Sequence, residues 1–167
     1  MNRAHRSSSL PAARAIALLA PALLLGGALL SQYVGGLYPC EMCLWQRWPH
    51  LAAILLALAA FALRGRAGLS RLLVALAALA IALSGAIGAF HAGVEYGWWE
   101  GVTACSVSMG GGSAQDMLDA IMAAPITRCD VAPWSLLGIS LAGYNALLSL
   151  GAALLIALLL RRQKDKA

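Results

Sequence analysis

The sequence has little charge. Only 11% of its 167 residues are Asp, Glu, Lys or Arg, whereas 61% are hydrophobic. A soluble domain of this size is excluded by that composition, because it could not cover its surface with polar groups. The net charge of +5 does not indicate nucleic-acid binding, since no basic patch is interleaved with aromatic residues. Apolar runs of about 18 or more residues are typical of transmembrane helices, so we expect an all-α integral membrane protein.

The apolar runs predict a single membrane domain, residues 1–167, built as a bundle of four transmembrane helices. The predicted spans cover about residues 15–34, 43–63, 72–91 and 136–160, with loops at about 35–42 and 92–135. The basic start followed by an apolar run also resembles a signal peptide. The run is long for that purpose and no small-x-small cleavage site follows it, so we expect an uncleaved span.

Positive charges are rare on one side of the predicted membrane domain. Ten of the 12 Lys and Arg residues lie on the other face, and six of the seven acids lie opposite them. The cations are Arg3, Arg6, Arg14, Arg64, Arg66, Arg71, Arg161, Arg162, Lys164 and Lys166. The acids are Glu41, Glu95, Glu100, Asp116, Asp119 and Asp130. The positive-inside rule then predicts a bacterial inner-membrane protein with both termini cytoplasmic and both loops periplasmic.

The second loop contains the pattern of a short helix. Residues 113–116 read as a capping box after the flexible Gly110–Gly112, and Pro125 ends the pattern. The apolar residues at helical spacing are Met117, Leu118, Ile121 and Met122. We expect an amphipathic helix on the outer membrane surface, although packing against the other loop fits the pattern equally well.

Cysteine is absent from the cytoplasmic side and from the interior of every apolar run. All four cysteines fall in the predicted periplasmic parts, where disulfides form readily. Cys40 and Cys43 form a CxxC pair, whose disulfide closes a loop too small to add much stability, so redox chemistry explains it better. Cys105 and Cys129 lie in the second loop, and their spacing suits a structural disulfide as well as a redox-active one.

Metal chemistry is a weaker explanation for these cysteines. A zinc site built from all four is disfavoured by their long separations and apolar flanks. Leu44 rather than His follows Cys43, so the signal for c-type haem attachment is missing. We therefore predict no metal site.

A cation lies one helical turn beyond the CxxC. The start of the helix and Arg47, four residues after Cys43, both favour the thiolate form of Cys43. A cation inside the apolar zone is costly, so Arg47 either extends to the lipid headgroups or donates to a polar ligand such as a quinone carbonyl. Gln46 could add a second donor. His91 could be a third, or an interfacial residue with its own partner.

Taken together, these features resemble the DsbB family of bacterial inner-membrane proteins. The resemblance covers nearly the whole chain. It comprises four spans, Pro39-Cys40-x-x-Cys43 opening the second, Arg47 after it, a second cysteine pair in the longer loop, and residues 134–139 (Trp-Ser-Leu-Leu-Gly-Ile) entering the last span. Gln46 stands where an acidic residue can precede the arginine in the family. The family's quinone-proximal histidine, at the end of the third span, can be aligned with either His91 or Glu95.

The resemblance implies a thiol:quinone oxidoreductase that supports disulfide bond formation. A periplasmic thioredoxin-fold oxidase, DsbA-like, would be reoxidised through a mixed disulfide with Cys105. Cys129 would pass the electrons to Cys40 and Cys43, and Cys43 would reduce a ubiquinone or menaquinone held near Arg47. From its place nearer solvent, we expect Cys40 to be the accessible sulfur that Cys129 attacks, with Cys43 leaving as thiolate. The alternative is a non-catalytic membrane scaffold with two structural disulfides.

Overall fold

The computed structural model describes residues 9–102, 115 and 127–164. These residues form helices α1 (Ser9–Tyr33), α2 (Glu41–Ala62), α3 (Ala67–Glu95) and α5 (Leu141–Lys164), with a short hairpin of β1 (Ser135–Leu136) and β2 (Ile139–Ser140). The predicted all-α architecture is therefore observed, apart from the hairpin. Cys105 and, apart from Gln115, the helix predicted after Gly112 lie outside the described residues.

Within the described residues, three helices are long and apolar enough to cross a membrane: α1, α3 and α5. The described part of the chain thus has the character of a membrane protein. The helix α2 has the length of a span but is not among the three, because its first half carries polar residues: Gln46, Arg47 and His50. The fourth span stays a prediction.

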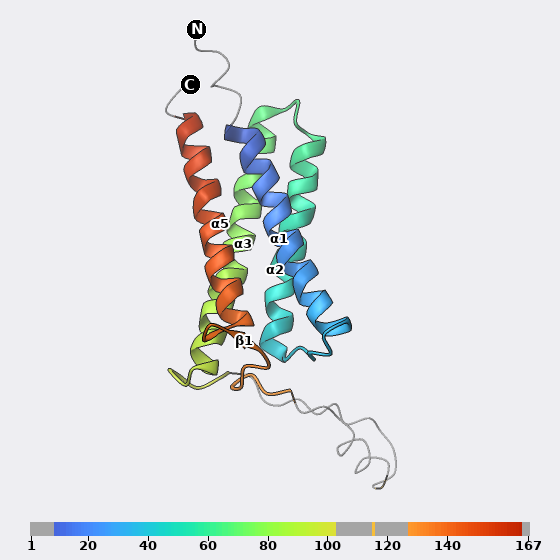
Figure 1. Cartoon of the computed structure of the whole chain (residues 1–167). Helices are drawn as coiled ribbons and strands as arrows, with labels where there is room; N and C mark the ends of the chain where they lie inside the picture. Colours follow the sequence, from blue (N-terminus) through green and yellow to red (C-terminus); the bar gives the residue numbers. More distant parts are fainter. Residues whose placement is uncertain (1–8, 103–114, 116–126, 165–167) are drawn as a thin grey trace.

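The four helices lie side by side along one long axis (Figure 1). The helix α3 packs along both α2 and α5, and α1 lies against α2 and α5. The start of α1 and the end of α5 lie at one end of the bundle, and the hairpin and the start of α2 lie at the other (Figure 1). We call these the terminal half and the cysteine half.

The terminal half has a core of small apolar residues. Ala13, Ala57 and Ala77 are fully buried there, together with Ile81 and Ile156. Small side chains let helix backbones approach closely, which is how helices gain packing energy where the surrounding solvent is also apolar. Large apolar side chains cover the outside of the bundle instead, including Leu23, Leu55, Leu79, Leu83, Leu147 and Leu154.

The last helix begins later than the sequence predicted, because residues 135–140 form the hairpin. Leu137 and Gly138 both have positive φ angles, 52° and 78°, which is the requirement of a type I′ two-residue turn. Ser140 then caps α5, since its Oγ accepts a hydrogen bond from the Gly143 backbone N–H at 3.1 Å. A residue that caps a helix lies outside it, so α5 starts at Leu141.

Glycine brings α3 and α5 together in the cysteine half. A Cβ atom on Gly88 would lie 3.0 Å from Asn145 Nδ2 and 3.1 Å from the Ala142 carbonyl oxygen. The close approach places the Asn145 side chain between the helices, where it becomes part of the site.

A buried dithiol beside an apolar cavity

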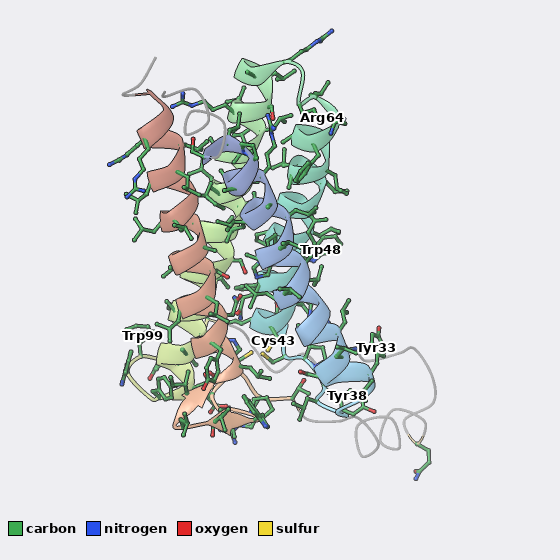
Figure 2. The ribbon with its side chains drawn as sticks, turned by 45° about the horizontal axis from the view of Figure 1, so that its top comes forward. Tyr33, Tyr38, Cys43, Trp48, Arg64 and Trp99 are labelled. Atoms are coloured by element: carbon green, nitrogen blue, oxygen red, sulfur yellow. The ribbon has the colours of Figure 1, made fainter. Side chains whose placement is uncertain are left out.

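The CxxC pair lies at the first turn of α2. Cys40 is the N-cap residue, and its Sγ accepts a hydrogen bond from the Cys43 backbone N–H at 3.3 Å. The Cys40 thiol donates to Cys43 Sγ at 3.0 Å, so the two sulfurs form a hydrogen-bonded dithiol. Figure 2 shows Cys43 at the same end of the bundle as Tyr38 and Trp99, far from Arg64. A donor on Cys40 and the positive end of the helix dipole both favour a thiolate at Cys43.

Cys40 is the more buried of the two sulfurs, with 5% of the residue exposed, while Cys43 is partly exposed. The expectation that Cys40 is the accessible sulfur is therefore wrong, because Met42 and Val94 pack against it. Its hydrogen bond to Cys43 and its burial raise the pKa of Cys40 to about 12. Cys40 thus keeps its proton at neutral pH.

Two residues from other parts of the chain lie close to Cys40: His91 of α3 and Cys129, which precedes the hairpin. The ligating atoms of Cys40, His91 and Cys129 all lie within 4.8 Å of one another, and His91 Nε2 is 3.5 Å from Cys40 Sγ. The sequence predicts that Cys40 and Cys129 lie on one side of the membrane, and the fold makes them neighbours. The trio is also close enough to ligate a metal ion, so the expected absence of a metal site stays a prediction.

A buried hydrogen-bond chain continues from His91 into the bundle. Gln46 Nε2 donates to the Met42 carbonyl oxygen at 3.0 Å, which fixes the orientation of the amide. The same nitrogen lies 2.9 Å from His91 Nδ1, which must therefore accept. The His91 proton then resides on Nε2, facing Cys40 Sγ and, at 3.7 Å, Glu95 Oε1.

Two residues that sequence reasoning missed extend this chain. Asn145 Nδ2 donates to Gln46 Oε1 at 2.7 Å, and Asn145 Oδ1 lies 2.8 Å from His50 Nε2. The signal available in the sequence was a polar side chain inside an apolar run, which inside a membrane usually marks function. His50 and Asn145 meet that criterion as Arg47 does.

An apolar cavity of about 240 Å³ lies beside Cys43, between α1, α2 and α5. Its apolar walls come mostly from α1, including Leu23, Leu24 and Ala28, and its polar lining includes Gln46, Arg47, His50 and Asn145. Of the predicted quinone contacts, Gln46 and Arg47 line this cavity. His91 is not among the residues around it and contacts Cys40 instead.

Arg47 points across the cavity to α1 rather than outward along its own helix. Its Nη1 donates to Gln32 Oε1 at 2.6 Å, and its Nη2 lies 3.4 Å from the Ala28 carbonyl oxygen. The Nε atom is buried and has no hydrogen-bond partner among the described residues. A buried donor without a partner is costly, so a ligand acceptor in this cavity would relieve the penalty.

Fold and site together define a membrane-embedded helical thiol protein. In it, a dithiol borders an apolar cavity that is lined in part by an arginine side chain. The chain belongs to the DsbB family: residues 11–159 match the family described as "Disulfide bond formation protein DsbB". It is therefore a membrane oxidoreductase of disulfide bond formation. It is also 29% identical over 139 residues to the "Uncharacterized protein RP370" of Rickettsia prowazekii (strain Madrid E), covering 81% of this chain and 79% of that protein. No solved structure matches the chain.

Proposed function

We propose that this protein reoxidises a periplasmic, DsbA-like dithiol oxidase and transfers the electrons through two cysteine pairs to a membrane quinone. The observation that carries the proposal is the position of Cys43, which lies between the buried sulfur of Cys40 on one side and the cavity with Arg47 on the other. A sulfur in that place can exchange with a thiol and also meet a ligand dissolved in the membrane.

The first exchange takes place at the second pair. A thiolate of the reduced partner attacks the Cys105–Cys129 disulfide at Cys105, and Cys129 leaves. The second thiol of the partner then attacks the mixed disulfide, releasing oxidised partner and leaving Cys105 and Cys129 reduced. Two electrons and two protons have moved from the partner to this chain.

The second exchange connects the two pairs. Cys129 attacks Cys40 in the Cys40–Cys43 disulfide, because those two atoms lie within 4.8 Å of each other. Cys43 leaves as a thiolate that the α2 N-terminus stabilises. Once Cys40 is released as a thiol, its hydrogen bond to Cys43 Sγ stabilises the thiolate further. Cys105 then attacks Cys129, which restores the Cys105–Cys129 disulfide and releases Cys40 as a thiol.

The cavity fits a quinone head group. Its walls are apolar, it borders Cys43, and the unpartnered Arg47 Nε supplies a donor for a ring carbonyl oxygen. A ubiquinone or menaquinone bound there would supply the oxidant, accepting the two electrons of the reduced pair, the proton of the Cys40 thiol and one further proton. Arg47 would hold the ring, and Gln46 would keep His91 oriented toward Cys40.

The decisive experiment is a thiol titration of the reduced protein in detergent, with and without a short-chain quinone, under anaerobic conditions. We expect the quinone to oxidise all four thiols, Cys40 and Cys43 directly and Cys105 and Cys129 by exchange, with one hydroquinone formed for every two thiols lost. The matched control is Cys43→Ser, which should consume none. Thiols that stay reduced with quinone present would instead support the membrane scaffold with structural disulfides.

The orientation is part of this proposal and has its own test. Reporter fusions after Gly68 and after Lys166 should report the cytoplasm, and a fusion at Gly111 should report the periplasm, as the charge distribution predicts. A periplasmic signal at Gly68 would contradict the compartment assigned to every cysteine.

A further inference from the structure

The proposed function gives no role to His50, a buried titratable residue. His50 is 3% exposed and lines the cavity, and its Nδ1 atom has no hydrogen-bond partner among the described residues. It follows Cys43 and Arg47 at helical spacing, so the three side chains share one face of α2. Arg47 accounts for one polar contact of a ring ligand, and His50 is placed for another.

The hydrogen bonds around His50 determine which ring nitrogen carries the proton. The orientation of the Asn145 amide is fixed because its Nδ2 donates to the Ser84 carbonyl oxygen at 3.2 Å. Its Oδ1, an acceptor, is 2.8 Å from His50 Nε2. Ser84 Oγ uses its proton on the Gln46 carbonyl oxygen at 2.9 Å, so it too accepts from His50 Nε2, at 2.9 Å. Nε2 therefore carries a proton.

The free Nδ1 is then an acceptor when the imidazole is neutral and a donor only when it is protonated. A buried acceptor without a donor is costly, and His50 lines the cavity, so a ligand hydroxyl there would relieve the penalty. A quinone carbonyl offers no hydrogen, whereas a hydroquinone hydroxyl does. Neutral His50 thus suits the reduced ring, and the imidazolium suits the oxidised ring.

We propose that His50 is the proton-exchanging contact of the quinone head group, a role that rests on the proposed function. The imidazolium donates its Nδ1 proton to one ring oxygen as the reduced cysteine pair is oxidised, and the neutral ring then accepts a hydrogen bond from the hydroxyl formed. The Cys43 thiolate and the Cys40 thiol supply two electrons and one proton, and His50 supplies the second proton. The products are the Cys40–Cys43 disulfide, neutral His50 and hydroquinone, so charge and atoms balance.

The test uses ligand binding without turnover. Short-chain hydroquinone is titrated into the reduced protein, and the corresponding quinone into the oxidised protein, so that protein and ligand cannot react. The variant is His50→Gln, whose amide can still donate to Asn145 but has no atom at the Nδ1 position. The matched control is Ser149→Ala, which removes a 2.9 Å hydrogen bond to Asn145 Oδ1 outside the cavity.

We expect His50→Gln to weaken hydroquinone binding about tenfold and to change quinone binding at high pH by about threefold or less. The pH dependence of the quinone reduction rate should also lose the limb that reports His50, which the Ser149→Ala control should keep. Unchanged hydroquinone affinity in His50→Gln would overturn the proposal. So would losses of hydroquinone and quinone affinity that are the same in His50→Gln as in Ser149→Ala.

Failure of the proposed function gives a different result. If the unsubstituted protein binds neither ligand and its thiols are not oxidised by quinone, the quinone reaction itself is wrong. If it reduces quinone normally and His50→Gln behaves like the unsubstituted protein, only the role of His50 is wrong.

Discussion

The two halves of the bundle differ in how many polar side chains they bury and in how these are paired. In the terminal half, Arg14 is buried, and its Nε donates to Ser70 Oγ at 2.8 Å, while Ser70 donates to the Ala60 carbonyl oxygen. The rest of that core is apolar and dominated by alanine. In the cysteine half, a chain of polar side chains runs from Cys40 to His50 through the bundle interior.

The difference lies in what remains without a partner. Among the described residues, the buried side-chain nitrogens that lack a hydrogen bond are Arg47 Nε and His50 Nδ1, and both residues line the cavity beside Cys43. A fold selected for stability alone would pair or remove such groups, as the terminal half does with Arg14. In the proposed function, these two unpaired groups are the ones that a quinone in the cavity would contact.

The largest effect should follow from replacing Cys43, whose sulfur connects thiol exchange with quinone reduction in the proposed function. Cys43→Ser should abolish quinone reduction. In that variant Cys40 can attack the Cys105–Cys129 disulfide at Cys129 and release Cys105, and the Cys40–Cys129 link should accumulate because no Cys43 thiol is present to attack it at Cys40. Mass spectrometry of disulfide-linked peptides measures this. Accumulation of a Cys40–Cys105 link would show that the order of exchange is wrong.

Cys105→Ser is the matched variant for that experiment. It should abolish the mixed disulfide with the dithiol partner while leaving Cys40 and Cys43 oxidisable by quinone. A mixed disulfide that still forms in Cys105→Ser would assign the partner contact to another cysteine.

A buried arginine, Arg14, and a half-buried one, Arg47, give the next comparison. Arg47→Ala should raise the quinone KM about 10- to 100-fold, since a charged hydrogen bond in a buried site contributes roughly 1.5–3 kcal/mol. Exchange with the dithiol partner should change little, and Arg47→Lys should restore only part of the affinity because it lacks the planar fork. Arg14→Ala is the control and should lower thermal stability without moving the quinone KM. Equal KM values for Arg47→Ala and the unsubstituted protein would mean that Arg47 only fixes α1.

Overpacking tests the alanine core of the terminal half. Ala57 is fully buried, so Ala57→Leu should lower the free energy of unfolding by about 1–3 kcal/mol. The quinone KM of the folded fraction should stay the same. Thermal unfolding in detergent and steady-state kinetics on one preparation measure both. A changed KM with unchanged stability would show that the halves are coupled.

The smallest effect concerns the hairpin before α5. Leu137 has φ 52° and is 90% exposed, so a branched side chain there occupies a backbone conformation that favours Asn or Gly. Leu137→Asn should raise the free energy of unfolding by about 0.5–1 kcal/mol. Leu136→Asn, next to it in β1, should not. A loss of stability in Leu137→Asn would indicate that this side chain is held by lipid or by another surface.

Much of the architecture could be predicted from the sequence because membrane burial imposes a strong pattern. The apolar runs predicted α1, α3 and α5 with ends that differ from the observed bounds by one to six residues, and the CxxC with Arg47 indicated the first turns of α2 as the candidate redox site. The late start of α5 could not be predicted, because Leu137 has a low propensity for the left-handed conformation that it adopts. Residues 135–140 therefore lack the usual residue pair of a two-residue hairpin turn.

The sequence by itself determined the class of protein, the helices that run through it and the presence of two thiol pairs with a nearby cation, since these depend on composition and short spacing. Only the tertiary structure decided which groups meet. The packing of α3 and α5 at Gly88 put Asn145 between Gln46 and His50, and the loop after α3 brought Cys129 to Cys40. Contacts between residues far apart in the chain depend on helix packing, which no local pattern encodes.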